Sequence, residues 1–129
     1  MRYPYLLSLF LSLTLLFTNC KKDDAALPDN LIGRTWLLSY EESKDGVEVY
    51  RPATYAFPPS RGRTGFSFDF NGEFTQLAIA PTDGHEVHKG KWTPITDDLF
   101  YISFEDNKRS NYKLHIISLD NDVLQVKDF

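Results

Sequence analysis

The sequence predicts an all-β fold, an antiparallel up-and-down barrel of about eight strands. Aromatic and aliphatic residues alternate with polar ones through most of the chain beyond residue 30. Turn-forming residues interrupt this alternation at spacings of about 8–12 residues, which is typical of barrels and sandwiches. No window shows the apolar stripe of a helix, and the 10 Phe, 7 Tyr and 2 Trp among 129 residues favour strands.

The first part of the chain has the layout of an export signal. An apolar run over residues 5–17 follows a positive start that includes Arg2. A signal peptide needs an apolar region of about 7–15 residues and a transmembrane helix needs about 20, so the run suits a signal peptide better. We therefore expect a signal peptide (1–19), a modified cysteine with its tether (20–30) and a barrel domain (31–129), with a transmembrane anchor as the alternative.

Cys20, the single cysteine, is the expected point of membrane attachment. The residues Leu16-Phe17-Thr18-Asn19-Cys20 resemble the lipobox of bacterial lipoproteins, in which the cysteine thiol receives a diacylglycerol with palmitate-type chains. Phe17 and Asn19 stand where that motif usually has Leu and Gly or Ala. Two or more acyl chains hold a protein stably at a membrane, whereas one does not. Because the thiol is used in this way, no intrachain disulfide forms and the domain depends on its core.

Three charged residues after Cys20 indicate where in the cell envelope the protein is expected to lie. Lys22, Asp23 and Asp24 resemble the export signal of surface lipoproteins in Bacteroidota-type bacteria, where a lysine and two acidic residues follow the modified cysteine. The resemblance implies a lipid-anchored protein of the outer membrane that is displayed on the cell surface. The alternatives are an ordinary solvated linker and retention on the periplasmic face.

The first two strands are expected over residues 35–40 and 47–50, joined by the turn Lys44-Asp45-Gly46. Residues 51–57 would continue the second strand at a sheet edge, because Pro52 cannot donate to a central ladder. The longest loop follows at residues 58–63.

The clearest period-two alternation is that of Phe66, Phe68 and Phe70. Asn71-Gly72 follows as a strong hairpin signal, and the partner strand is expected over residues 74–80. A three-residue loop with a bulge would pair Phe70 with Phe74 and keep the aromatic residues together. Four more strands are expected over residues 87–95, 100–104, 112–116 and 123–127.

A family resemblance fits this order of strands. Gly33-Arg34-Thr35-Trp36 is similar to the Gly-x-Trp start of lipocalins, with two residues in place of one between Gly and Trp. The segments Phe68–Phe74, Gly90-Lys91-Trp92 and 119–126 are similar to small lipocalin-like domains of bacterial lipoproteins. The resemblance implies a barrel with an apolar calyx and Trp36 as the plug of its closed end. Lipocalins also place an Arg of the last strand over that indole, where this chain has only Lys127.

Several functions have little support in the residues. The net charge of −4 provides no basic field for nucleic acid. His85 and His88 are three apart in a strand or turn and would point to opposite faces, so a solvated hairpin is favoured over a metal site. No nucleophile elbow and no phosphate-binding glycine loop occur. We therefore expect no enzyme activity, no cofactor and no metal.

The expected function is the binding of a small apolar or amphipathic ligand without catalysis. A barrel of eight strands is either filled by its own side chains or holds one small ligand. Two arginines of the long loop, Arg61 and Arg63, could clamp an anionic group at the barrel mouth, although such loops are more often exposed and mobile. The residues expected to face inward and to line the ligand are Trp36, Leu38, Tyr40, Phe66, Phe68, Trp92, Phe100, Ile102, Tyr112 and Leu114.

The alternative is a solid β-module that docks to a protein partner of the cell envelope. Such a module should present a contiguous apolar patch on its outer face. Leu37, Leu99 and Ile117 are the candidates for that patch.

Overall fold

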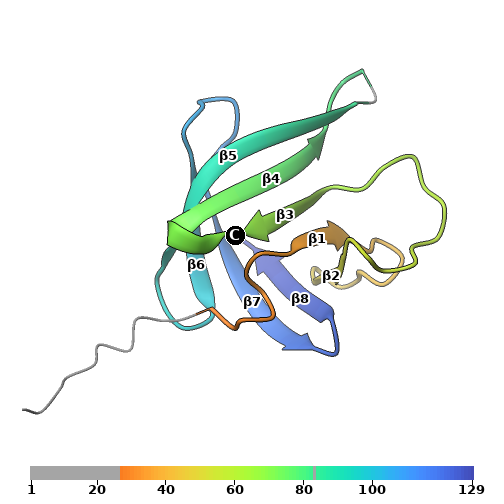
Figure 1. Cartoon of the computed structure of the whole chain (residues 1–129), viewed down its shortest axis with the longest axis horizontal. Coiled ribbons are helices and arrows are strands. Elements are labelled where there is room, and N and C mark those ends of the chain that lie inside the picture. Colours follow the sequence, from red (N-terminus) through yellow and green to blue (C-terminus); the bar gives the residue numbers. More distant parts are fainter. Residues whose placement is uncertain (1–26, 83) are drawn as a thin grey trace, which may run out of the picture.

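The structure, a computed structural model, describes residues 27–82 and 84–129. It is a closed barrel of eight strands with one short 3₁₀ turn, η2 (Phe70–Gly72) (Figure 1). The strands are β1 (Thr35–Leu38), β2 (Glu48–Pro52), β3 (Gly65–Phe68), β4 (Glu73–Ile79), β5 (His85–Pro94), β6 (Leu99–Phe104), β7 (Tyr112–Asp120) and β8 (Val123–Asp128).

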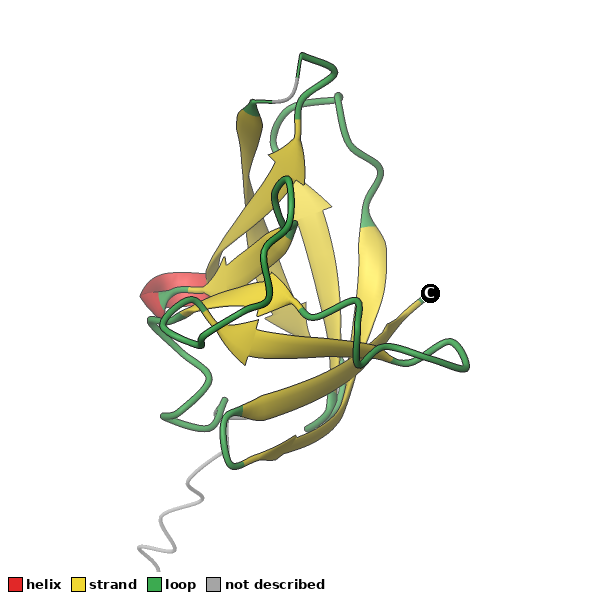
Figure 2. Ribbon diagram, turned by 90° about the vertical axis from the view of Figure 1, so that its right-hand side faces the viewer, coloured by secondary structure: helices red, strands yellow, loops and turns green. Residues whose placement is uncertain are grey.

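The expected fold class, an all-β antiparallel barrel of eight strands, is confirmed. Figure 2 shows the strands curving round the interior, with η2 outside them at one side. Strands β3 to β8 form a simple meander. The order departs from a pure meander at β1, which lies between β2 and β3, so that β2 pairs with β8 to close the barrel.

This order requires a long connection from β2 to β3. Residues 53–64, here called the strap, run from one end of β1 to the other across its outer side (Figure 1). Pro52 ends β2, opposite Trp36 of β1, and the backbone N–H of Ala53 donates to the carbonyl oxygen of Thr35 at 2.9 Å. The expected continuation of the strand beyond Pro52 is therefore wrong, because the chain leaves the sheet there to cross β1.

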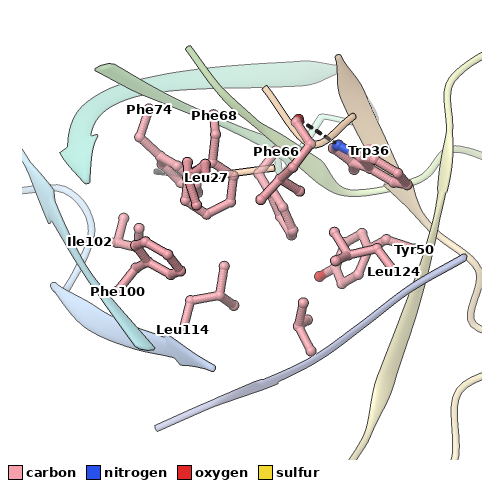
Figure 3. Close-up of a cluster of buried hydrophobic side chains, with 12 residues drawn as sticks. Leu27, Trp36, Tyr50, Phe66, Phe68, Phe74, Phe100, Ile102, Leu114 and Leu124 are labelled. Carbon is pink, nitrogen blue, oxygen red and sulfur yellow. Dashed lines mark hydrogen bonds between the residues drawn. The ribbon is translucent and has the colours of Figure 1, made fainter. Parts of the chain in front are cut away.

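The barrel has a closed end and an open end. The segment before β1 seals the closed end, where Leu27 and Leu31 are buried among the core side chains. The indole Nε1 of Trp36 donates to the carbonyl oxygen of Leu31 at 3.1 Å (Figure 3). The β1–β2, β4–β5 and β6–β7 connections all lie at the open end, as the strand registers require.

The cation that lies over Trp36 comes from the residue before β1 and not, as the resemblance implied, from the last strand. The Arg34 guanidinium carbon is 5.1 Å from the centre of the Trp36 ring, and Nη1 of Arg34 donates to Asp122 at 2.8 Å. Lys127 of the last strand is exposed and lies beside Phe129.

Aromatic side chains fill the closed half of the interior (Figure 3). Phe68 packs edge-on against Phe74 and Phe100, with ring centres 5.1 and 5.8 Å apart, a favourable geometry for aromatic pairs. The fully buried large side chains are Leu31, Trp36, Phe66, Phe68, Phe74, Phe100, Ile102, Leu124 and Val126.

Gly65 lets β3 lie close to β1. A Cβ built at this position would collide with the backbone carbonyl oxygen of Trp36 and would meet Leu37 at 2.8 Å. Only glycine therefore fits where the strap enters the sheet.

Two expectations for aromatic residues are wrong. Phe70 does not pair with Phe74, because Phe74 pairs with Phe68 instead. Residues 69–72 form a longer loop around η2, and the Asp69 N–H donates to the Glu73 carbonyl oxygen at 2.9 Å to close it. Phe70 is 70% exposed. Tyr40 lies beyond the end of β1, is 51% exposed, and packs under the guanidinium of Arg63.

The residues that bear the expected anchor lie outside the described part of the chain. These are the signal peptide, Cys20, and the export residues Lys22, Asp23 and Asp24. Over the ranges that the structure describes, no helix has the length and apolar character needed to cross a bilayer.

Candidate functional site: the open end of the barrel

Most of the residues expected to face inward do so. Trp36, Phe66, Phe68, Phe100, Ile102 and Leu114 are buried, and Leu38, Trp92 and Tyr112 pack against them; Tyr40 is the exception. These side chains fill the closed half of the barrel themselves. Among the described residues, these side chains occupy the space in which the resemblance implied a deep apolar calyx, and the pocket described next lies nearer the mouth.

A pocket of about 250 Å³ opens at that end, here called the mouth pocket. Its floor is apolar, formed by Phe66 and Leu114 on top of the aromatic core. Its walls are polar and come from four strands and two connections. The lining residues are Glu48, Tyr50, Thr64, Phe66, Gln76, Arg109, Tyr112, Leu114 and Asp128.

Strand periodicity brings these polar groups inside. Gln76 lies between Phe74 and Ala78 on the inward face of β4, and Glu48 precedes Tyr50 by two residues on β2. Asp128 follows Leu124 and Val126 on the inward side of β8. The inward faces of these strands thus change from apolar to polar toward the open end.

Hydrogen bonds fix the two phenols of the pocket. The Tyr112 hydroxyl donates to Oε1 of Gln76 at 2.7 Å, and Nε2 of Gln76 donates to the carbonyl oxygen of Gly65 at 3.2 Å. The Tyr50 hydroxyl donates to Oε2 of Glu48 at 2.7 Å. Gln76 is only 7% exposed, and these two hydrogen bonds hold its side-chain amide from both ends.

Burial raises the pKa of both phenols well above the ordinary value. For Tyr50, the carboxylate of Glu48 adds to this effect through its hydrogen bond and its charge. For Tyr112, Arg109 acts in the opposite direction, and Asp128 and Glu48 raise the pKa further. Both side chains are therefore neutral hydrogen-bonding groups at physiological pH.

His88 stands beside the pocket, next to Gln76 across β4 and β5. It is 7% exposed, and its Nδ1 and Nε2 lie 3.3 Å from Asp106 and Glu86 respectively. His85 is exposed on the other face of β5, as its spacing from His88 predicts. The expectation of a solvated hairpin is right for His85 and wrong for His88. Among the described residues, no group of three or more His, Asp or Glu side chains could hold a metal ion.

A second pocket lies outside the barrel. It measures about 530 Å³ and separates the strap from the outer faces of β1 and β4. Its apolar lining residues include Leu37, Leu77, Phe57 and Pro58, and His85 lines it as well. Residues that form this strap pocket are Thr35, Leu37, Ala53, Phe57, Pro58, Ser60, Arg63, Leu77 and His85.

Arg63 does not clamp a ligand at the mouth, because its guanidinium already has partners. Nη1 and Nη2 donate to the two oxygens of Glu41 at 2.9 and 2.6 Å, and also to the carbonyl oxygens of Leu38 and Pro58, each at 3.0 Å. The Arg63 guanidinium holds the pKa of Glu41 at about 2. Arg61 is exposed on the strap.

The candidates for an outer apolar patch do not lie together. Leu37 is on β1 under the strap, whereas Leu99 and Ile117 are on β6 and β7. β2 and β8 separate β1 from β7 in the sheet. The contiguous patch that the docking alternative requires is therefore not formed by these three residues.

Sequence reasoning missed the polar residues of the mouth pocket other than Tyr112. Glu48, Gln76 and Asp128 each share strand parity with an inward aromatic or aliphatic neighbour, and that parity is the signal that could have found them. Arg109 belongs to the β6–β7 connection, whose position depends on the closure of the whole barrel.

Compared with family models, curated proteins and solved structures, the chain matches none.

Proposed function

We propose that this protein is a lipid-anchored lipocalin-like lipoprotein of the outer membrane that binds a small amphipathic molecule at the open end of its barrel, without transforming it. The observation that carries this proposal is the mouth pocket, whose fixed polar wall stands above an apolar floor. Binding sites commonly combine an apolar surface with a few oriented polar groups.

The size of the pocket limits the ligand. At about 250 Å³ it lies below the range of roughly 300–1,000 Å³ usual for drug-sized ligands. Because Phe66 and Leu114 rest on a filled core, a long chain has no room to descend into the barrel. The ligand is therefore short, with its apolar part on these two residues and its polar part against the wall.

The chemistry of the lining favours holding a ligand over reacting with it. The hydroxyls of Tyr50 and Tyr112 are protonated and already donate to Glu48 and Gln76. The lining contains no histidine, cysteine or serine. These groups suit recognition by hydrogen bonds and charge.

The position of the first described residue supports an orientation. Leu27 is buried at the closed end, and Cys20 precedes it by seven residues, a distance of at most about 25 Å in extended chain. A lipid on Cys20 would hold the closed end near the membrane. The mouth pocket would then face away from it, which fits display on the cell surface as well as on the periplasmic face.

The experiment that tests this function is native mass spectrometry of the full-length protein, purified from its own host's membranes without denaturation. We expect an added small mass that solvent extraction removes. Thr64→Tyr, which fills the mouth pocket, should abolish the added mass. Ser60→Tyr, which fills the strap pocket instead, should leave it unchanged.

Two outcomes would contradict the proposal. A bare protein mass that also fails to bind small fluorescent apolar probes would leave the barrel as a solid module. An added mass that Ser60→Tyr removes and Thr64→Tyr does not would move the site to the strap pocket.

A further inference from the structure

We infer that the mouth pocket is selective for a cation, namely an organic ammonium group on a short apolar or aromatic body. This inference rests on the proposed function and specifies its ligand. It is drawn from the two carboxylates of the pocket, which the barrel leaves without basic partners.

Glu48 and Asp128 face the same space. Glu48 pairs with Val126 across β2 and β8, and Asp128 follows Val126 by two residues on the same face of β8. Within the described residues, no nitrogen of Lys, Arg or His lies within 4.0 Å of either carboxylate, although other carboxylates form such pairs. The hydroxyl of Tyr50 is the one described side-chain donor to Glu48.

Three other carboxylates at the open end of the barrel are paired. Glu41 binds Arg63 at 2.6 Å, and Glu86 and Asp106 both contact His88 at 3.3 Å. These pairs fix the strap and the β6–β7 connection. Asp45 and Glu105, which are exposed in the connections at this end, form no ion pair among the described residues. What distinguishes Glu48 and Asp128 is that both are unpaired and line the pocket.

The one basic residue of the pocket does not cancel their charge. Arg109 lines the same space, but its guanidinium carbon lies 5.9 Å from the centre of the Phe104 ring, where it is held against an aromatic face. Two carboxylates and one guanidinium give the pocket a net charge of −1. A ligand anion would face Glu48 and Asp128 as well as Arg109.

The other lining groups suit an ammonium. An ammonium donates three hydrogen bonds, and both carboxylates and the lone pairs of the Tyr50 oxygen can accept them. Tyr50 also lines the pocket with its aromatic ring, next to the Glu48 carboxylate that its hydroxyl contacts, and Phe66 packs against that ring from the buried side with the ring centres 4.6 Å apart. A cation near such faces gains about 0.5–2 kcal/mol, depending on how far it is desolvated.

The test compares three soluble probes of one shape: benzylamine, benzyl alcohol and benzoate. Isothermal titration calorimetry is done on the full-length lipoprotein in lipid nanodiscs, with empty nanodiscs as the blank. Benzylamine should bind about tenfold more tightly than benzyl alcohol, since a hydrogen bond to a charged group contributes at least that factor. Benzoate should bind most weakly.

Variants assign the preference to the two carboxylates. Glu48→Gln and Asp128→Asn should each weaken benzylamine by about tenfold and leave benzyl alcohol unchanged. Glu73→Gln, which removes an exposed carboxylate at the closed end, should change neither affinity. Asp128 is exposed, so Asp128→Asn keeps the test valid even if Glu48→Gln disturbs folding through Tyr50.

The outcomes separate this inference from the proposed function. Binding of benzyl alcohol or benzoate as tight as that of benzylamine overturns the cation selectivity, while binding at the mouth stands. An affinity for benzylamine that survives both substitutions overturns it equally. If none of the three probes binds, the inferred cation selectivity is wrong. If native mass spectrometry also shows no added mass that Thr64→Tyr removes, the proposed function is wrong as well.

Discussion

Trp36 and Leu31 are joined by a hydrogen bond of 3.1 Å from the indole Nε1 to the backbone carbonyl, and both side chains are completely buried. The bond links the barrel wall to the segment that seals the closed end. Trp36→Ala should lower the free energy of unfolding by about 3–5 kcal/mol, because it removes a large core side chain. Trp36→Phe should cost about 1–3 kcal/mol, chiefly through the unpaired carbonyl of Leu31.

Urea denaturation followed by tyrosine and tryptophan fluorescence measures both changes. Ile95→Ala is a suitable control, since Ile95 is about half exposed in the turn after β5 and should change stability by less than about 0.5 kcal/mol. A loss below about 1 kcal/mol for Trp36→Ala would show that Trp36 is not a core plug.

Gly65→Ala should prevent stable folding or lower the free energy of unfolding by several kcal/mol. The added methyl collides with the carbonyl oxygen of Trp36, and backbone atoms in a paired strand cannot move aside freely. Gly84→Ala is the matched control, because a Cβ there meets nothing within 4 Å. Thermal unfolding of the two variants compares them, and equal midpoints would contradict the close approach of β1 and β3.

The Glu41–Arg63 pair should make the barrel sensitive to acid. Arg63 lowers the pKa of Glu41 from its ordinary 4.5 to about 2, so between these pH values the unfolded chain binds more protons at this residue than the folded one. The stabilisation is complete above pH 4.5 and is lost as the pH falls through 2. Glu41→Gln should flatten this part of the stability profile.

Urea unfolding at several pH values between 6 and about 2 measures that slope. Asp97→Asn, which removes an exposed carboxylate at the closed end, should keep the wild-type slope. Parallel profiles for wild type and Glu41→Gln would show that the pair does not form in solution.

Tyr50 and Tyr112 should ionise after the other tyrosines. Their phenol pKa values are raised by burial, whereas Tyr40, Tyr55 and Tyr101 are exposed. Because the folded pKa lies above that of the unfolded chain, these two residues stabilise the fold below about pH 10 and oppose folding above it. Absorbance at 295 nm should therefore show that two of the five tyrosines within residues 27–129 titrate together with unfolding. Titration of all five in the folded state would contradict the buried pocket wall.

Cys20→Ala should release the protein from membranes. The physical reason is the loss of the acyl chains, each buried methylene of which contributes about 0.8 kcal/mol to membrane binding. Fractionation of cells followed by immunoblotting measures the change, with Asp97→Asn as a variant that should stay in the membrane fraction. An unchanged membrane fraction for Cys20→Ala would favour the transmembrane alternative.

Strand-level features could be predicted from the sequence because they are local. The alternation of Phe66 with Phe68, or of Phe100 with Ile102, reports which side chains share a face, and burial of all four confirms it. The same rule gave a wrong prediction for Tyr40, because the alternation in the sequence continues past the end of β1 into a turn. The predicted pairing of Phe70 was wrong because Asn71-Gly72 lies within a longer loop and not in a two- or three-residue hairpin turn. In that loop Asn71 has a φ of 67°.

The position of β1 and the nature of the pocket depend on distant contacts. Residues 35–38 themselves do not indicate that β1 lies between β2 and β3. The position of β1 depends on β2 pairing with β8, where Tyr50 lies opposite Leu124. The same closure brings Glu48 and Asp128 into one space. Arg63 could be noticed in the sequence, but its partner Glu41 is 22 residues away and its burial follows from the path of the strap.

The insertion of β1 between β2 and β3 affects how the barrel can fold while the chain is being synthesised. β1 and β2 precede the other six strands of the barrel, yet β2 reaches its second neighbour only when β8 is present. During synthesis or passage across a membrane, the free edge of β2 stays unpaired until β8 has followed, and unpaired edges invite contact with other chains. A factor that shields exposed strand edges until β8 arrives would thus act on this protein at the edge of β2.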